Sequence, residues 1–227
     1  MNLLELEKLS LYEANINGFH LEIASGEAVV LFGRDGTGKN AVLKIAAGIF
    51  ENHGGVVAWS PAARKLPMPL AYLPSTGGLI ENMTLLQNVS LPVMYHELMT
   101  PDEARLSAQK ILEEYGLESA AGLLPADVDE VTRRLSLFAR ADLISPLLYI
   151  IEEPLADMDS SAIQAIDQRL NEIKERSDSA VLLSTGEVGP YLDWGDRFVF
   201  LSPGRFKTFS SRKELLDSED PEVRVFL

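Results

Sequence analysis

The stretch from Gly33 to Lys39, which reads GRDGTGK, constrains this chain more than any other because it fits the pattern G-x-x-x-x-G-K. The apolar run from Ala28 to Phe32 precedes it and is typical of a strand buried in a parallel sheet; the helical pattern of Ala41 to Ala47 follows it. Between such a strand and helix, backbone N–H groups and the helix N-terminus surround a phosphate, and the lysine meets its outer oxygens. We therefore expect a phosphate-binding loop formed by Gly33, Asp35, Gly36, Thr37, Gly38, Lys39, Asn40 and Ala41.

The residue after Lys39 departs from the usual pattern, in which a serine or threonine hydroxyl binds the magnesium ion that bridges the terminal phosphates. Asn40 places a bulkier amide at this position, and Ala41 has no polar side chain. Phosphate binding can survive this change where catalysis does not. A glycine-rich turn that binds no ligand is the alternative interpretation of the stretch.

A second apolar strand, from Leu147 to Ile151, ends in the paired acids Glu152 and Glu153. Phosphate-loop enzymes place a metal-holding acid at the end of such a strand. Glu152 is therefore the candidate metal ligand, although it is one methylene longer than the usual Asp and Mg²⁺ demands a tight octahedral geometry. Glu153 is the candidate catalytic residue, since it could orient a water as a general base. A strand that ends in solvated acids is the structural alternative.

Two strand patterns and one helical region organise the rest of the chain. Residues 3–7 and 19–23 alternate apolar and polar side chains, which predicts antiparallel strands. The region from Met83 to Ser145 is helical in pattern, with a helix that begins at Pro101 and stops at Gly116. Continuous apolar runs predict further buried strands at 70–73, 147–151, 180–183 and 197–201. Together these patterns predict an α/β fold.

The composition excludes several classes of function. The chain has 227 residues, with 20 Lys and Arg against 34 Asp and Glu, so its formal net charge of −14 repels nucleic acid. It has no cysteine, and its three histidines, His20, His53 and His96, lack metal-ligand spacing, so a thiolate or histidine metal site is not expected. The apolar runs are too short for a membrane span. We expect a cytoplasmic protein that does not bind nucleic acid.

With these motifs in place, the chain resembles the ATP-binding subunit of an ABC transporter over essentially its whole length, and within that family the ATPases of MCE (Mla-type) lipid transport systems. The ending 220–227 points most specifically to the lipid-transport branch. The resemblance implies an ABC ATPase fold: a P-loop NTPase (RecA-like) core with an antiparallel β layer and an inserted helical subdomain. The stretches that carry the resemblance are 26–27, 33–39, 83–92, 125–154 and 220–227.

The family pattern also implies a domain plan and partners. The plan is a single nucleotide-binding domain with its core at 1–82 and 146–209, its helical subdomain at about 83–145 and a C-terminal helical tail at 210–227. The resemblance implies ATP as the cofactor, with Mg²⁺ left open. It implies a separate membrane permease, which residues 75–91 would contact, and a second ABC ATPase subunit in a hetero- or homodimer. The protein would then lie peripherally on the inner face of the cell membrane.

Position by position, the resemblance exposes a series of losses. Ser75 stands where the family has the glutamine of the Gln-loop, and Gly186 replaces the switch histidine. The signature LSGGQ, which in the family dimer caps the γ-phosphate bound by the other subunit, falls on Val128 to Thr132. The D-loop acid persists as Asp159. Tyr12 is either an adenine-stacking residue or a strand tyrosine that packs on the sheet.

These losses favour a degenerate nucleotide-binding subunit that docks on a permease, with lipid as the implied cargo, and that binds ATP but hydrolyses it poorly. One alternative is an active ATPase that uses Lys39 and Glu153 with altered metal ligation. Another is a scaffold that kept the fold and needs no nucleotide. Asp129 and Glu130 in the signature predict against a symmetric, ATP-closed homodimer, because two carboxylates would face the triphosphate.

Overall fold

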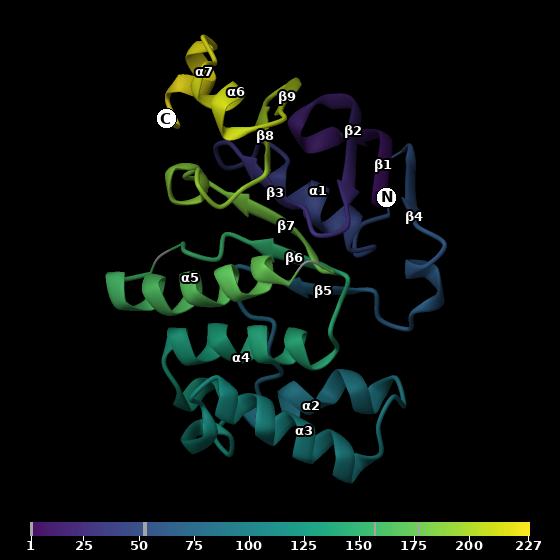
Figure 1. Cartoon of the computed structure of the whole chain (residues 1–227), viewed down its shortest axis with the longest axis vertical. Coiled ribbons are helices and arrows are strands. Elements are labelled where there is room, and N and C mark those ends of the chain that lie inside the picture. Colours follow the sequence, from purple (N-terminus) through teal and green to yellow (C-terminus); the bar gives the residue numbers. More distant parts are fainter. Residues whose placement is uncertain (1, 52–53, 157, 177) are drawn as a thin grey trace. The chain divides into compact units, whose positions relative to one another are not determined.

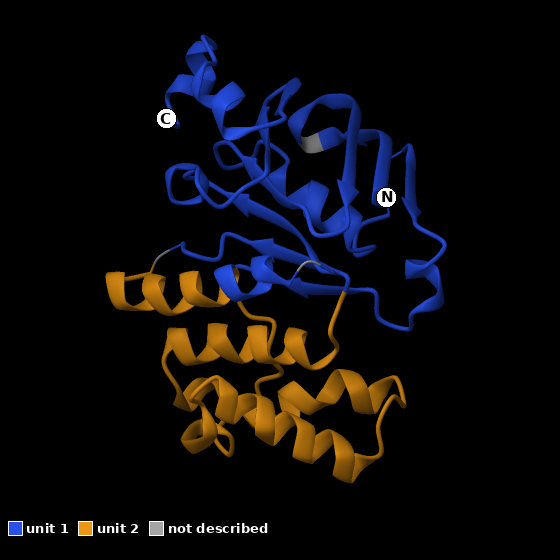
Figure 2. Ribbon diagram, in the orientation of Figure 1, with its two compact units in different colours: residues 1–75, 147–156, 171–227 blue, residues 76–146, 157–170 orange. Residues whose placement is uncertain are grey.

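The computed structural model describes residues 2–51, 54–156, 158–176 and 178–227, so His53 lies outside the described residues. The chain divides into two compact units (Figure 2). The first unit comprises residues 1–75, 147–156 and 171–227, and the second comprises 76–146 and 157–170. The domain boundaries expected from the sequence remain a prediction.

A six-stranded sheet forms the centre of the first unit (Figure 1), in the order β5-β6-β7-β3-β8-β9. Every neighbouring pair is parallel except β8 and β9, which are antiparallel. The bounds are β3 Ala28–Phe32, β5 Leu70–Leu73, β6 Leu148–Glu152, β7 Ala180–Thr185, β8 Arg197–Ser202 and β9 Arg205–Phe209. The apolar runs of β3, β6, β7 and β8 become strands buried on both faces, whereas β5 lies at the edge of the sheet and is partly buried. The strand β9 is not expected from the sequence.

A three-stranded antiparallel sheet, ordered β2-β1-β4, completes the β structure of this unit. Its strands are β1 Asn2–Leu11, β2 Ile16–Ala24 and β4 Val56–Trp59. The alternation in β1 and β2 sends their apolar side chains into one core together with those of β3, β6, β7 and β8. Helix α1, Lys39–Ala46, belongs to the same core and contacts both sheets. Short 3-10 turns lie at Tyr12–Ala14, Ala63–Lys65 and Gly189–Tyr191.

The second unit consists of helices. They are α2 Leu85–Tyr95, α3 Pro101–Glu114, α4 Glu130–Leu143 and the first part of α5 Ser160–Glu175, with 3-10 turns at Glu118–Ala120 and Pro125–Asp127. Helices α2 and α3 begin in capping boxes at Thr84 and Thr100, and both pack with α4. The predicted start of α3 at Pro101 is confirmed, and Gly116 follows its end at φ 68°.

The C-terminal residues fold onto the first unit. Two short helices, α6 Arg212–Leu216 and α7 Pro221–Arg224, follow β9. The Phe226 ring then packs against Phe32 and Phe200, with centroids 5.7 and 5.8 Å apart. The tail therefore contacts β3 and β8 near the loop that follows β3.

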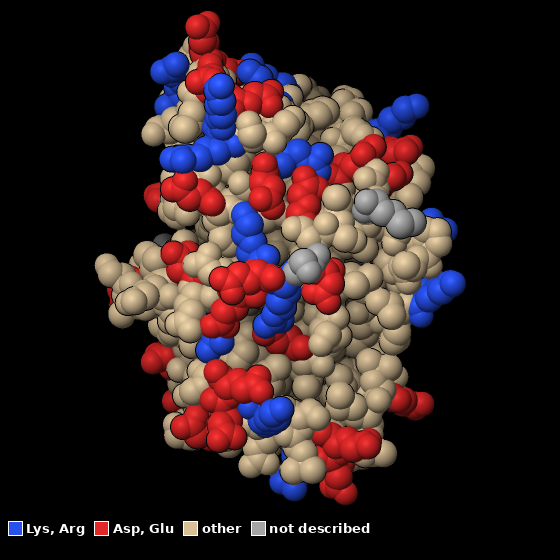
Figure 3. Space-filling view, viewed as in Figure 1, with Lys and Arg blue, Asp and Glu red and all other residues tan. Residues whose placement is uncertain are grey.

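In the ranges that the structure describes, no helix is both long and apolar enough to cross a membrane. On the face drawn in Figure 3, Lys and Arg side chains lie dispersed among Asp and Glu. The net charge of −14 comes from the excess of 34 Asp and Glu over 20 Lys and Arg in the whole sequence. The expectation that nucleic acid is not a partner stays a prediction.

Candidate functional site

The loop between β3 and α1 is built so that only glycine fits at its start. A Cβ atom on Gly33 would lie 2.2 Å from the Leu201 carbonyl oxygen, far inside contact distance. The Thr37 hydroxyl donates to the Arg34 carbonyl oxygen at 2.7 Å and closes the turn. Gly38 is the N-cap of α1 at φ 91°, and it has no side chain that could accept a bond from the first N–H groups. This helix end therefore keeps backbone donors for an anion, as the motif predicts.

The Lys39 side chain is buried, with 3% of its surface exposed, and lies back over the loop. Its ammonium donates to the carbonyl oxygens of Gly33 and Arg34, at 2.5 and 3.2 Å. The carboxylates of Glu153 and Asp35 lie 3.4 and 3.8 Å from the same nitrogen. Lys39 is thus held inside the loop, next to the helix end where a phosphate would bind.

Glu153 follows β6 in a left-handed conformation, with φ 42°. One carboxylate oxygen accepts from the Gly186 N–H at 2.8 Å, and the other faces Lys39. Its own N–H donates to the Ser184 carbonyl at 3.0 Å. Glu153, the candidate general base, therefore contacts both Lys39 and Gly186, the residue that stands where the family has the switch histidine.

Glu152 points to different partners. It is buried, with 3% of its surface exposed, and accepts a short hydrogen bond from the Tyr72 hydroxyl. The Ser75 N–H lies 3.4 Å from its second oxygen, and the Lys44 ammonium lies 4.0 Å from the first. Burial and the bond to Glu152 raise the pKa of Tyr72 well above its ordinary value, so this hydroxyl remains a donor.

Asn40, at the position of the missing hydroxyl, is also bonded within the protein. Its side-chain oxygen accepts from the Ser184 hydroxyl at 3.1 Å. The parallel register places Ser184 directly beside Glu152 on the neighbouring strand. Sequence reasoning missed Tyr72 and Ser184 as site residues, because their roles depend on which strands are neighbours.

Phosphate groups and magnesium fit this site differently. The glycine loop, the N-terminus of α1 and Lys39 supply the donors that an oxyanion needs. A divalent cation would need oxygen ligands that are free to turn toward it. The candidate ligands Glu152 and Asn40 already accept hydrogen bonds from Tyr72 and Ser184. Within the described residues no cluster of three His, Asp or Glu side chains could hold a metal ion. The donor set therefore suits phosphate and does not suit magnesium.

Tyr12 lies at the tip of the hairpin between β1 and β2, in a 3-10 turn. Its side chain is 63% exposed, so the alternative that it packs on the sheet is wrong. The same turn lies against the phosphate loop, because a Cβ atom on Gly38 would be 3.0 Å from the Ala14 methyl group. An exposed ring beside the loop is compatible with base stacking, which remains a prediction.

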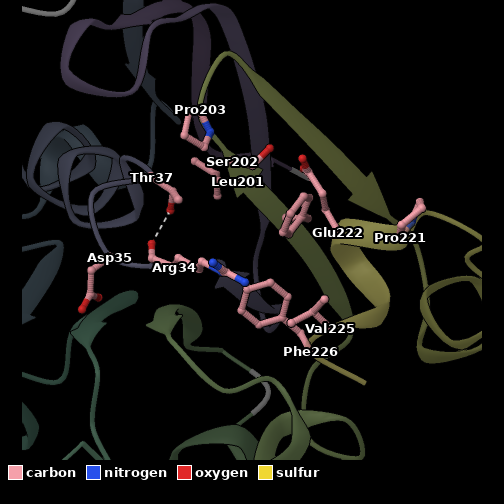
Figure 4. Close-up of a pocket in the computed structure, with 11 residues that line it drawn as sticks. Arg34, Asp35, Thr37, Leu201, Ser202, Pro203, Pro221, Glu222, Val225 and Phe226 are labelled. Atoms are coloured by element: carbon pink, nitrogen blue, oxygen red, sulfur yellow. Dashed lines mark hydrogen bonds between the residues drawn. The ribbon is translucent and has the colours of Figure 1, made fainter.

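A cavity of about 490 Å³ opens on another side of the loop (Figure 4). Arg34, Asp35 and Thr37 line it from the loop, opposite residues of β8 and of the C-terminal segment, Phe226 among them. Lys39 and Asn40 do not line it. The cavity therefore shares Asp35 and Thr37 with the predicted phosphate loop but does not extend to the first residues of α1.

The signature and D-loop positions belong to the second unit. Asp129 is the N-cap of α4, where its carboxylate accepts from the Thr132 N–H at 2.7 Å. This backbone hydrogen bond lowers the pKa of Asp129. Glu130 pairs with Arg133 at 3.0 Å. Asp159 accepts from the Ala162 N–H at 2.9 Å, as an N-terminal cap does. These acids thus have structural roles within their own unit.

Comparison with known proteins gives a consistent result. A family model described as ABC transporter matches residues 16–156. The ABC transporter ATP-binding protein YthP of Bacillus subtilis is 26% identical over 207 residues, which cover 91% of this chain and 84% of that protein. The phosphonates import ATP-binding protein PhnC of Hyphomonas neptunium is 29% identical over 204 residues, covering 84% and 78%.

A solved structure of the ATP-binding subunit of an ABC transporter superposes with a TM-score of 0.80 at 27% identity, covering 98% of each chain. The fold is thus α/β, of the P-loop NTPase type found in ABC ATPase cassettes. The family model covers more than half of the chain, and its match includes the loop, β6 with Glu152 at its end, and Glu153. This chain belongs to the ABC transporter family, as an ATP-binding subunit.

Proposed function

We propose that this subunit binds ATP at the N-terminus of α1, hydrolyses it slowly, and acts while attached to a separate membrane permease. The observation that carries the proposal is the state of Glu153. Its carboxylate is bonded to the Gly186 N–H and faces Lys39, at 2.8 and 3.4 Å. The N-terminus of α1 keeps donors that suit a phosphate, while the carboxylate that could activate water is already bonded within the protein.

Binding is supported by the donors around the loop. The first N–H groups of α1 have no side-chain acceptor at Gly38, and the helix dipole favours negative charge there. Lys39 lies beside them and can exchange the carbonyl oxygens of Gly33 and Arg34 for phosphate oxygens. Charge-assisted bonds of this kind contribute about 1.5–3 kcal/mol each.

Slow hydrolysis is supported by what surrounds Glu153. The Gly186 position has a backbone N–H but no imidazole, so it can hold the carboxylate and cannot exchange a proton at neutral pH. Asn40 replaces the hydroxyl that holds magnesium, and Ser75 replaces the Gln-loop glutamine. Losing a positioned acid–base or electrostatic group costs about 10²–10⁴-fold in rate for each function.

Calorimetric titration of the full chain with ATP tests binding. We expect saturable binding, weakened about tenfold or more in Lys39→Ala because a charge-assisted contact is lost. Lys110→Ala, an exposed lysine on α3, is the matched control and should bind ATP normally. If millimolar ATP gives no signal and Lys39→Ala changes nothing, the scaffold alternative replaces this proposal.

The permease and the second ATPase follow from family membership. ABC ATP-binding subunits work with membrane permeases and dimerise. We propose a heterologous ATPase as the partner, because Asp129 and Glu130 cap and flank the N-terminus of α4 where the family places an uncharged signature. Peripheral attachment to the inner membrane face would follow from the permease. Capture of a permease and a second ATPase from detergent-solubilised membranes supports this assembly, whereas recovery of this chain alone opposes it.

The cargo is a separate part of the proposal. The resemblance of residues 83–92 and 220–227 to Mla-type ATPases supports lipid, while PhnC is named for phosphonates import. Reconstitution of the complete complex in proteoliposomes with a fluorescent phospholipid tests the cargo. ATP-dependent movement of the phospholipid between membranes is expected. ATP-dependent uptake of a water-soluble solute, without lipid movement, would overturn the lipid assignment.

A further inference from the structure

We propose that this chain binds the phosphates of ATP without magnesium, and that Tyr72 is the positioning residue that holds Glu152 away from a metal ion. The inference rests on the proposed function, because it concerns the same loop. It goes further by naming what replaces the metal site. Two side chains at metal-ligand positions, Glu152 and Asn40, are each held by a hydroxyl from a neighbouring strand.

Both oxygens of the Glu152 carboxylate have partners. Tyr72 donates to one oxygen, which also lies 4.0 Å from the Lys44 ammonium, and the Ser75 N–H lies 3.4 Å from the other. The residue is only 3% exposed, so water cannot replace a partner that is lost. Turning Glu152 toward a cation would break the hydrogen bond from the half-buried Tyr72 and would move a buried carboxylate away from its partners, which is costly.

Sheet register explains why Tyr72 can reach Glu152. Strands β5 and β6 are parallel neighbours, and Tyr72 lies opposite Ile150. Side chains alternate along a strand, so Ile150 and Glu152 share the face on which Tyr72 lies. The long tyrosine side chain spans the step of two residues to the carboxylate.

Asn40, in the first turn of α1, is the second side chain at a metal-ligand position that is already bonded within the protein. Its oxygen accepts from Ser184, which lies beside Glu152 in the β6–β7 register. Mg²⁺ requires near-octahedral oxygen ligands at about 2.0–2.1 Å and keeps several waters, so it tolerates misplaced ligands poorly. Positive charge for the phosphates then comes from Lys39 and the N-terminus of α1, which need no metal.

The experiment compares ATP affinity in millimolar Mg²⁺ with affinity in EDTA, by calorimetry on the full chain. The wild type should bind ATP equally in both buffers. Tyr72→Phe frees Glu152, and since groups that orient a metal ligand change metal affinity by about 10–100-fold, it should bind ATP about tenfold tighter in Mg²⁺ than in EDTA. Tyr95→Phe, a tyrosine 78% exposed on α2, is the control and should behave as the wild type does.

Two readouts separate positioning from simple destabilisation. With Mn²⁺ in place of Mg²⁺, only Tyr72→Phe should add a Glu152 carboxylate ligand to the Mn²⁺ of bound Mn·ATP, so its electron paramagnetic resonance spectrum should differ from that of the wild-type complex. If that variant does not fold, Glu152→Gln serves instead, because removing the charge should leave ATP affinity in Mg²⁺ unchanged when no metal touches residue 152.

Each outcome bears on the inference. Magnesium-enhanced ATP binding by the wild type would overturn it and leave the proposed function standing. A folded Tyr72→Phe that stays metal-independent would overturn the role of Tyr72, as would a loss of Mg²⁺-supported affinity in Glu152→Gln. Absence of ATP binding in both buffers would overturn the proposed function and the inference together.

Discussion

The N-termini of helices α1 and α4 differ in whether a side chain of the protein caps them. Helix α1 begins at a glycine N-cap without a side chain, has no acid in its first turn and holds the buried Lys39. Helix α4 begins at Asp129, whose carboxylate takes the Thr132 N–H at 2.7 Å, and Glu130 lies in its first turn. Both helices have the same dipole. The capping residue therefore decides whether a helix end is open to an external anion or already filled by the protein.

The difference matters because ABC ATP-binding subunits dimerise. In the family arrangement that the sequence resembles, the signature helix of one subunit meets the γ-phosphate bound by the other. In a symmetric pair of these chains, the uncapped N-terminus of α1 in each subunit would face the α4 N-terminus that Asp129 caps in the other. A partner with an intact signature would complete the phosphate site of this chain.

The largest expected effect concerns self-association. Two like charges 4 Å apart repel by about 4 kcal/mol at an effective dielectric of 20, and Asp129 and Glu130 would meet a triphosphate twice in a homodimer. We expect the isolated chain to keep the same mass in sedimentation and light scattering with and without ATP. An ATP-dependent homodimer in which Asp129 crosslinks close to the opposing nucleotide would contradict the claim that the capped N-terminus of α4 excludes a triphosphate.

The next effect concerns Gly33, at the start of the loop that leads to the uncapped N-terminus of α1. Gly33→Ala would place a methyl group 2.2 Å from the Leu201 carbonyl oxygen, and we expect it to lower the free energy of unfolding by about 3 kcal/mol and to abolish ATP binding. Gly36→Ala is the matched control. Among the described residues nothing lies within 4 Å of its Cβ position, so only its φ of 74° would cost about 1 kcal/mol. Equal losses in denaturant unfolding of both variants would show that the loop is not tight at Gly33.

A smaller effect is expected at the N-terminus of α4, which Asp129 caps. Asp129→Ala removes the cap of α4 and should lower the free energy of unfolding by about 1 kcal/mol, while Asp129→Asn should retain most of it. The backbone bond lowers the pKa of Asp129 in the folded state. Its contribution is therefore present above the unfolded pKa of about 4 and is lost as the pH falls through the folded value. Urea titrations from neutral to acidic pH check this, and an identical acid profile for wild type and Asp129→Asn would contradict it.

The smallest effect is expected from the ion pair beside that cap. Glu130 lies 3.0 Å from Arg133 on a solvent-exposed face. Exposed pairs at this spacing contribute about 0.5 kcal/mol or less and are screened by salt. Glu130→Gln should therefore change stability marginally at low salt and not at high salt. A loss as large as that of Asp129→Ala would mean that Glu130 also caps the helix.

The parts predicted from sequence are those whose signals are local. The apolar runs of β3 and β6, the glycine pattern at Gly33 and the start of α3 at Pro101 are all where the sequence predicts them. Strand β9 was missed because the charged Arg205 and Lys207 interrupt its apolar pattern. The apolar run Val56–Trp59 that forms β4 was not recognised, although its composition suits a strand.

The bonded state of the site could not be predicted in the same way. The residue types of Glu152 and Asn40 mark them as unusual metal ligands, but their partners come from other strands. The Tyr72 to Glu152 contact needs β5 beside β6 in one particular register. The exposure of Tyr12 likewise depends on the 3-10 turn that follows β1. Such contacts between distant segments have no signal in a single sequence.

The most direct test of the central claim is a single-turnover assay, in which radiolabelled ATP is mixed with excess protein and Mg²⁺ and phosphate release is followed. Because Glu153 is held by Lys39 and Gly186, we expect bound ATP to be cleaved at least about 10²–10⁴-fold more slowly than in an enzyme that turns over at about 1 s⁻¹. Magnesium-dependent cleavage at about 1 s⁻¹ or faster, abolished by Glu153→Gln, would contradict the account and identify this subunit as a working ATPase.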